Sequence, residues 1–493
     1  MPSKEPEFLS PSPEKIFIGE TPLREYLVEA GLGWVIRIRE LLEMSDLSKL
    51  TAGYQRKGRH AIHPVVMLGL IVYGILQRQW SLRELEKLAS RDVAAWWLCG
   101  GLRPDHSTIG KFIRMHAEVL SEEYFVELTK MLATKLKLTS GSASCDGTVI
   151  EAAGSHYKTL QEESAKLAAR EAQEKAEAQP QDQQAQDVAQ RAQQVAQRAV
   201  ERADKRRQKG KDPKSTRVCV TEPEAVVQPL KNGARRPSYK PSVLADSNRL
   251  IVGKHLHPSD ETAAVAPMLE QHRAIFGGLP DRLMLDAGYH NYVVLGMSIE
   301  LDLDVLCPSG KADRGQWEKK NGRKQYPKDR FKFDPEADRF ICPQGEELTF
   351  LRRESSPSGG AFKKYRCNSC DQCPRRSECT TSKNGRTINR YASDELKECM
   401  AEVFRDERAR LAYGQRKAHV EPVFGELREG QGLTRFHRHG LAGAGVEYSL
   451  HCIAYNLMKA QRIEFALLIC AAPGPSAGGR LTVLIFGVFV LSR

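Results

Sequence analysis

The sequence predicts a mixed α/β protein in which an all-helical N-terminal domain precedes an α/β core that carries two insertions. Three observations support this class: helix-forming sequence from Ile62 to Leu120, short strands alternating with helices from Tyr239 to Cys307, and two stretches that fit neither pattern. Of the 493 residues, 41% are hydrophobic and 28% are charged. The chain therefore has enough apolar material for sizeable cores, and global disorder is excluded.

The N-terminal domain is expected over residues 1–135. Ser81 with Glu84 three residues later has the pattern of a capping box, and Asp105 offers a further helix start. Short helices joined by tight turns, such as the one at Gly100-Gly101, suit a domain of helix-turn-helix type. DNA binding is one role for such a domain, and a helical scaffold without DNA contact is the alternative.

The first part of the core is expected over residues 136–157, and the first insertion, residues 158–236, is an Ala/Gln-rich arm. Between Gln161 and Val200 there are 11 alanines and 11 glutamines. A weak heptad seam follows Pro180 and consists of Ala185, Val188, Ala192, Val195 and Ala199. Because proline interrupts a helix, we expect a helical hairpin or a partly ordered arm. Its basic end, residues 202–211, is a candidate for DNA-backbone contact or an ordinary solvated face.

The second part of the core, residues 237–308, alternates between strands and helices. The expected elements are strands at Val243–Asp246, Leu250–His255, Arg282–Asp286 and Val305–Cys307, and helices at Asp260–Ile275 and Tyr292–Glu300. This alternation predicts a parallel or mixed sheet with helices on its faces. Acidic residues at strand ends then lie where open α/β sheets keep their sites.

The second insertion is expected over residues 309–410, where the periodic pattern is lost. Basic and aromatic residues mix between Lys311 and Phe333, a composition suited to phosphate contact and base stacking or to a solvated loop. Five of the chain's 12 cysteines follow: Cys342, Cys367, Cys370, Cys373 and Cys379. Such a cluster favours metal over disulfides in a chain without a secretion signal. We expect Cys342, Cys370, Cys373 and Cys379 to hold structural Zn²⁺, with Cys367 able to replace any one of them.

The last part of the core is expected over residues 411–465, closing with a helix at Glu447–Phe465, and residues 466–493 form a tail. From Ala471 the tail matches nothing before it, which suggests a reading-frame extension. The late apolar run, Leu481–Leu491, is too short to span a bilayer. No membrane partner is expected, and the protein should be cytoplasmic.

Charge and three acidic residues point toward nucleic-acid chemistry. Lys and Arg number 74 against 62 Asp and Glu, a net charge of +12 that favours a polyanionic partner. Asp146 and Asp286 fall on predicted strands and Glu421 in or beside a late helix, separated by 140 and 135 residues. Three carboxylates brought together by a fold would repel one another unless Mg²⁺ or Mn²⁺ neutralised them. Two such ions about 4 Å apart can promote phosphodiester cleavage.

The sequence around these acids resembles the DDE transposases of bacterial insertion sequences. Residues 413–428 read Tyr-Gly-Gln-Arg-Lys-Ala-His-Val-Glu-Pro-Val-Phe-Gly-Glu-Leu-Arg, similar to the family's tyrosine-arginine-glutamate-lysine signature, with Arg428 in the place of lysine. Asp-Gly-Thr at 146–148 and Asp-Ala-Gly-Tyr at 286–289 resemble its two aspartate motifs. Residues 80–86 and 103–109 are similar to its N-terminal helical domain, and one branch has a cysteine-rich insert before the glutamate helix.

The resemblance implies a ribonuclease H-like core with Asp146, Asp286 and Glu421 as catalytic, metal-binding residues. It implies that the protein, with Mg²⁺ or Mn²⁺, cleaves double-stranded DNA at the element ends and transfers the cut strands to target DNA. We expect a homo-oligomer, a dimer on DNA, because two ends must be held together, and nucleoid association when DNA is bound. Arg416, Lys417 and Arg428 are expected to position phosphates, and Tyr289 and Tyr413 to orient the strand.

Some alternatives stay open. Glu426 is the rival for the third acid because it lies five residues after Glu421. Pro422 suggests that Glu421 sits at a helix start or a kink. A non-catalytic DNA-binding protein derived from a transposase, or a metal-dependent nuclease without strand transfer, is the alternative function.

Overall fold

The computed structural model describes residues 8–9, 11–52, 54, 60–309, 318–320, 323–355, 361–391 and 394–471. It divides into two compact units. The first unit comprises Met1–Leu160, Val218–Asp281 and Lys417–Arg493, and the second comprises Gln161–Arg217 and Arg282–Arg416. The predicted DNA-contacting residues between Lys311 and Trp317 and the tail after Ala471 lie outside the described residues.

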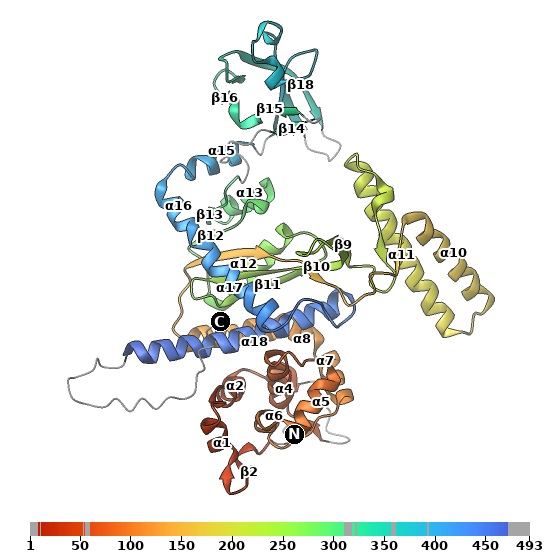
Figure 1. The fold of residues 1–493 in the computed structure, drawn as a ribbon, viewed down its shortest axis with the longest axis vertical. Helices are drawn as coiled ribbons and strands as arrows, with labels where there is room; N and C mark the ends of the chain where they lie inside the picture. The colour runs from red at the N-terminus through yellow and green to blue at the C-terminus, as the bar shows by residue number, and fades with distance from the viewer. Residues whose placement is uncertain are drawn as a thin grey trace, which may run out of the picture. The chain divides into compact units, whose positions relative to one another are not determined.

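Among the described residues of the first unit, nine α-helices form the N-terminal region, as predicted (Figure 1). They are α1 (Leu23–Glu29), α2 (Gly33–Met44), α3 (Ser48–Thr51), α4 (Pro64–Leu76), α5 (Leu82–Arg91), α6 (Val93–Cys99), α7 (His106–Met115), α8 (Ala117–Ser121) and α9 (Glu123–Lys135). Helix α4 is its centre, because residues 64–75 are all buried. Helices α2, α5 and α6 pack against it.

The predicted helix starts are confirmed. The Ser81 side chain accepts a hydrogen bond from the Glu84 N–H, and the Glu84 carboxylate accepts one from the Ser81 N–H, which completes the capping box of α5. Asp105 caps α7 through the N–H of Thr108. Helix α6 ends at Gly100, whose left-handed backbone (φ 57°) favours glycine.

The first unit also contains an antiparallel sheet. Its strands are β5 (Ser142–Gly147), β6 (Ile150–Glu151), β7 (Thr159–Leu160), β8 (Val218–Cys219), β9 (Val226–Pro229), β10 (Arg235–Asp246) and β11 (Ile251–His257). The order is β5-β10-β9-β8-β7, and β6 and β11 also pair with β10. Strand β10 is longer than the predicted Val243–Asp246, because Pro237 and Pro241 obscure a segment that its pairing partners hold extended.

Helices α12 (Val265–Phe276) and α18 (Gly440–Ala471) pack against β11. Helix α18, in blue in Figure 1, also contacts α2, α4, α8 and α9 and so joins the sheet to the N-terminal helices. One hydrophobic core runs from these helices through β10 and β11 to α18. The predicted helix at Glu447–Phe465 is therefore only the middle of a longer one. Within the described residues no helix is long and apolar enough to cross a bilayer.

The second unit contains the predicted helical hairpin, α10 (Glu162–Ala178) and α11 (Gln183–Gln208), with Pro180 in the turn. The seam is partly wrong: Val195 and Ala199 are buried, but Val188 is 55% exposed. Ala176, Ala189 and Ala203 are buried as well. The packing residues are mostly alanines, so the two helices hold together through close backbone approach.

The remaining α/β elements of the second unit are parallel strands β12 (Arg282–Met284) and β13 (Asp304–Leu306) with α13 (Tyr292–Glu300) between them. Further along are strands β14 (Glu318–Lys320) and β15 (Arg323–Gln325) and helices α14 (Arg376–Cys379), α15 (Asp394–Val403) and α16 (Glu407–Gly414). The helix after Tyr292 and both strands were predicted within one or two residues.

The segment after Pro308, where the sequence shows no periodic pattern, nevertheless contains regular structure. Five antiparallel strands form a sheet there, in the order β16 (Lys332–Asp334), β17 (Arg339–Ile341), β18 (Glu347–Ser355), β19 (Ala361–Cys367) and β20 (Thr387–Tyr391). Charged residues dominate these short strands, and the core under them is a small cluster that includes Phe340, Leu348 and Tyr365. The apolar alternation is therefore too sparse to be seen in the sequence.

Candidate functional site

Asp146 lies near the end of β5, where the strand leaves the core. Its backbone pairs with that of Val243 in β10, and the preceding Cys145 is fully buried. The Gly147 N–H donates a hydrogen bond to Asp146 Oδ1 at 2.9 Å. A Cβ at position 147 would meet Glu261 Cγ at 2.9 Å, so this close approach requires glycine. The aspartate is thus half-buried at a sterically defined strand end.

Glu421 lies inside α17 (Arg416–Gly425). Buried Val420 and Val423 anchor one face of this helix, and the Glu421 side chain is 63% exposed on the other. The Lys417 ammonium, one turn earlier, lies 4.0 Å from the Glu421 carboxylate. The exposed face therefore combines an acid and a cation.

Two contacts hold the strand that carries Asp146 against the helix region that carries Glu421. On the N-terminal side of both acids, the Ser144 hydroxyl and His419 Nδ1 share a buried hydrogen bond of 3.0 Å. On the C-terminal side of both acids, the Arg428 guanidinium donates to Thr148 Oγ1 at 2.8 Å. Both acids therefore fall between the same pair of cross-links.

Pro422 does not mark a helix start, which corrects that part of the expectation: α17 continues through it, and the alternative of a kink stays a prediction. Proline has no N–H, so the carbonyl of Ala418, four residues earlier, loses its helical donor. The Arg249 Nε donates to this carbonyl at 2.9 Å. A side chain from the β10–β11 turn thus supplies the missing hydrogen bond and lets Glu421 sit in mid-helix.

Glu426 has a different environment. It begins a π-helical turn, Glu426–Gly430, and is half-buried. A Cβ at Gly430 would meet its carboxylate at 2.6 Å. Burial, followed by the charge of Glu426, raises the pKa of Tyr455 in α18. Glu426 therefore acts electrostatically on a core tyrosine, whereas Glu421 faces solvent.

Asp286 belongs to the second unit, just after β12. It caps the short 3-10 helix Ala287–Tyr289, with Oδ1 accepting from the Gly288 N–H at 2.7 Å. The Cys307 thiol donates to the Asp286 carbonyl at 3.2 Å. Burial and then the Asp286 charge raise the pKa of Cys307 to about 12, so this thiol is neutral. The capped turn fixes the backbone of Asp286 while its side chain stays partly exposed.

Three further predicted site residues lie in the second unit. Tyr289 is fully buried and Arg416 is 6% exposed. The Arg416 charge acts on Cys307, whose pKa it lowers against the larger effect of burial. The ring of Tyr413 packs edge-on against Phe404, with 5.3 Å between centroids. Tyr289 and Arg416 are therefore interior residues near the Asp286 turn rather than surface contacts.

All five cysteines of the predicted zinc cluster line one small pocket, together with Tyr326, Phe331 and Arg386. Backbone N–H groups point at two of the sulfurs: that of Gln344 at Cys342 and that of Arg386 at Cys370, each at 3.3 Å. Burial raises the pKa of Cys367 to about 12 and that of Cys379 to about 11. Among the described residues, no three His, Cys, Asp or Glu side chains are grouped so that they could hold a metal ion as they stand.

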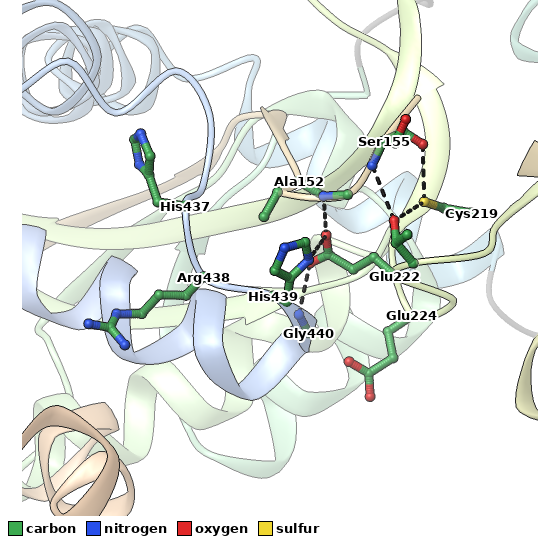
Figure 2. A network of polar contacts seen from close by, with 12 residues as sticks. Ala152, Ser155, Cys219, Glu222, Glu224, His437, Arg438, His439 and Gly440 are labelled. Carbon is green, nitrogen blue, oxygen red and sulfur yellow. Dashed lines mark hydrogen bonds and ion pairs between the residues drawn. The ribbon is translucent and has the colours of Figure 1, made fainter. Parts of the chain in front are cut away.

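Sequence reasoning missed a buried polar network at the start of α18 (Figure 2). Glu222, 1% exposed, accepts hydrogen bonds from the Gly154 N–H at 2.5 Å, the Tyr239 hydroxyl at 2.9 Å and the Gly440 N–H at 3.0 Å. Glu224 accepts from the Leu441 N–H at 2.5 Å. Two carboxylates from one loop thus satisfy free N–H groups at the positive end of α18. No local sequence motif predicts this pairing.

Two family models match the chain. One, described as a transposase domain (DUF772), matches residues 34–115 and so covers α2 to α7. The other, described as a transposase DDE domain, matches residues 341–461 and covers the cysteine cluster and the helix with Glu421. No curated protein matches the chain. A DDE domain implies a ribonuclease H-like fold, and the two matches, in this order, support a DDE transposase of the insertion-sequence type.

Proposed function

We propose that this transposase cleaves DNA at the ends of an insertion sequence and transfers the strands to target DNA, with Asp146, Asp286 and Glu421 as its catalytic acids. The observation that carries the proposal is the pair of cross-links, Ser144 to His419 and Thr148 to Arg428, that bracket Asp146 and Glu421. Asp146 and Glu421 come from segments far apart in the sequence. A helix with only a structural role would not need to be fixed beside the strand that carries Asp146. Asp286 is the proposed third carboxylate.

The residues suit Mg²⁺ or Mn²⁺. All three proposed ligands are carboxylates, the oxygen donors that these hard cations prefer, and each side chain keeps exposed surface. The ions, when bound, supply the positive charge that activates an attacking hydroxyl and stabilises the leaving oxygen. The chain's own part is to hold the acids: β5 and Gly147 for Asp146, the capped turn for Asp286, and α17 for Glu421.

The exposure of each candidate side chain decides which residues we propose as DNA contacts. Lys417 is 75% exposed beside Glu421, which suits a phosphate contact, and Arg428 can serve the same phosphate from its place beside Thr148. Tyr413, half-buried, retains its proposed role in orienting the strand. Because Tyr289 and Arg416 are buried, we propose that they support the Asp286 turn instead of touching DNA.

The cysteine pocket is proposed to hold structural Zn²⁺ through Cys342, Cys370, Cys373 and Cys379, with Cys367 as the possible substitute. Five sulfurs around one pocket, with N–H groups aimed at two of them, match the soft, hydrogen-bonded donor set of a zinc–thiolate site. The thiols must deprotonate and draw together to bind the ion.

A dimer on DNA is proposed because two element ends have to be joined.

The test is cleavage of a labelled duplex that carries the flanking ends of the gene's own locus, with Mg²⁺, Mn²⁺ or EDTA. Glu421→Gln should abolish metal-dependent cleavage while DNA binding persists, and Glu426→Gln should leave cleavage within about tenfold of wild type. Specific binding without any cleavage by folded wild type would refute the catalytic proposal. Cleavage without joining of the new end to target DNA would instead establish a nuclease.

A further inference from the structure

The helical segment that carries Glu421 leaves main-chain carbonyls without helical donors at two places. The first is at Ala418, whose partner would be the N–H that Pro422 lacks. The second is the end of the π-helical turn, where the carbonyls of Glu429 and Gly430 are among the last of the helix. Turns of this π type are rare and are often found at functional sites. At each place an arginine from elsewhere in the first unit donates hydrogen bonds to these carbonyls.

Arg249 meets the first place. It lies in the β10–β11 turn with a left-handed backbone (φ 65°), and its Nε donates to the Ala418 carbonyl at 2.9 Å. Its own carbonyl accepts from the Tyr455 hydroxyl of α18 at 2.8 Å. The turn is therefore tied to a core helix while its side chain reaches α17.

Arg78 meets the second place. It follows α4 of the N-terminal region and also has a left-handed backbone (φ 57°). Its Nε donates to the Gly430 carbonyl at 2.9 Å, and its Nη2 donates to that of Glu429. Glycine adopts this conformation readily, so it can replace either arginine without changing the backbone.

Trp80, two residues after Arg78, extends the contact. Its Nε1 donates to His437 Nδ1 at 3.0 Å and lies 3.3 Å from the carboxylate of Glu447. A Cβ at Gly432 would lie 3.3 Å from the Trp80 ring, which shows how closely the chain after the π turn approaches the indole. The connection between α4 and α5 thus packs against the segment that follows α17 and donates hydrogen bonds to it.

We propose that Arg78 and Arg249 are positioning residues for Glu421, and that Arg78 couples the N-terminal helical domain to the active site. The two guanidinium groups fix the helix on either side of the acid, at Ala418 and at Glu429 and Gly430, so its rotation and translation are set by the β10–β11 turn and by the α4–α5 connection. A shift of the N-terminal domain on binding an element end reaches Glu421 through Arg78. This coupling rests on the proposed function of Glu421.

The test uses Arg78→Gly and Arg249→Gly, because glycine keeps the left-handed backbone and removes only the side chain. Each variant should cleave bound ends about tenfold more slowly and need a higher Mg²⁺ concentration, with element-end affinity within about twofold of wild type. Lysine at either position should restore part of the rate. Arg273→Ala, which removes an exposed pair with Glu270 on α12, is the matched control and should behave as wild type.

Amide hydrogen exchange supplies a readout that does not depend on catalysis. Exchange between Val420 and Gly432 should become about tenfold faster in both glycine variants and stay unchanged in the middle of α18. In wild type, binding of an element end should slow exchange in the same segment, and Arg78→Gly should remove that effect.

The outcomes separate the two proposals. If wild type does not cleave but exchange responds as expected, the positioning role stands and the catalytic proposal falls. If wild type cleaves and the glycine variants keep its rate, Mg²⁺ requirement and exchange pattern, the positioning role is overturned. A uniform loss of thermal stability, with faster exchange throughout the first unit, would also overturn it, because the arginines would then serve the fold as a whole.

Discussion

Glu222 should be one of the most costly residues to remove outside the proposed active site. Its carboxylate is 1% exposed and accepts hydrogen bonds from three donors, on Gly154, Tyr239 and Gly440. In Glu222→Ala these donors lose a charged acceptor in a buried site, and each unsatisfied group costs about 1–3 kcal/mol. Removing the carboxylate also returns the cost of burying its charge, which offsets part of this loss.

The net expectation for Glu222→Ala is a loss of about 3 kcal/mol in the free energy of unfolding, within the range for broken buried networks. Glu222→Gln should lose about half as much, because one oxygen still accepts from Tyr239 and Gly440 while the amide faces the Gly154 N–H. Glu224→Ala, which removes one half-buried acceptor at the same helix end, is the matched control and should cost about 1 kcal/mol.

Urea unfolding followed by far-ultraviolet circular dichroism measures these differences, and hydrogen exchange at Gly440 and Leu441 localises them. A loss below about 1 kcal/mol for Glu222→Ala would refute the reasoning, since three donors cannot all be left unsatisfied at that cost. Equal losses for Glu222→Ala and Glu224→Ala would show that charge at the helix end matters and that the buried hydrogen bonds do not.

Three further predictions concern metal, pH and the C-terminal end. The purified protein should carry about one Zn²⁺ per chain by elemental analysis, and Cys373→Ser should lower both the zinc content and the melting temperature, whereas retained zinc would exclude Cys373 as a ligand. Burial lowers the pKa of His451 from its usual 6.5 to about 4, so the neutral form is favoured in the folded state, and this contribution to stability is complete above pH 6.5 and is lost as the pH falls toward 4. The urea midpoint should therefore drop between pH 7 and pH 5 by more in wild type than in His451→Gln, and equal drops would contradict this assignment. Truncation after Gln461 should lower the melting temperature, because it removes Glu464, which pairs with Arg37 at 2.6 Å. Truncation after Ala471, the last residue of α18, should leave the melting temperature unchanged. A lower melting temperature for the truncation after Ala471 than for the one after Gln461 would contradict this prediction.

Local signals were sufficient for much of the fold. The capping box at Ser81, the cap at Asp105 and the break at Gly100 depend on neighbours within a few residues, so the sequence predicts them directly. The same is true of α13, whose strong apolar pattern and Asn291 cap fall in one short segment. Where charged residues or prolines occupy strands, as in β10 and β18, pairing with distant strands overrides the local preference, and the prediction failed.

For the site, the sequence by itself determined which acids are candidates and which family words surround them, because those motifs are contiguous. Only the tertiary structure decided that Glu421 faces solvent in mid-helix while Glu426 acts on a core tyrosine, and that Tyr289 and Arg416 are buried. It alone decided that Arg249 replaces the hydrogen bond lost at Pro422 and that Arg78 closes the π-helical turn. The physical reason is that each arginine joins a carbonyl more than a hundred residues away in the sequence, and no local pattern records which distant donor will meet an unsatisfied carbonyl.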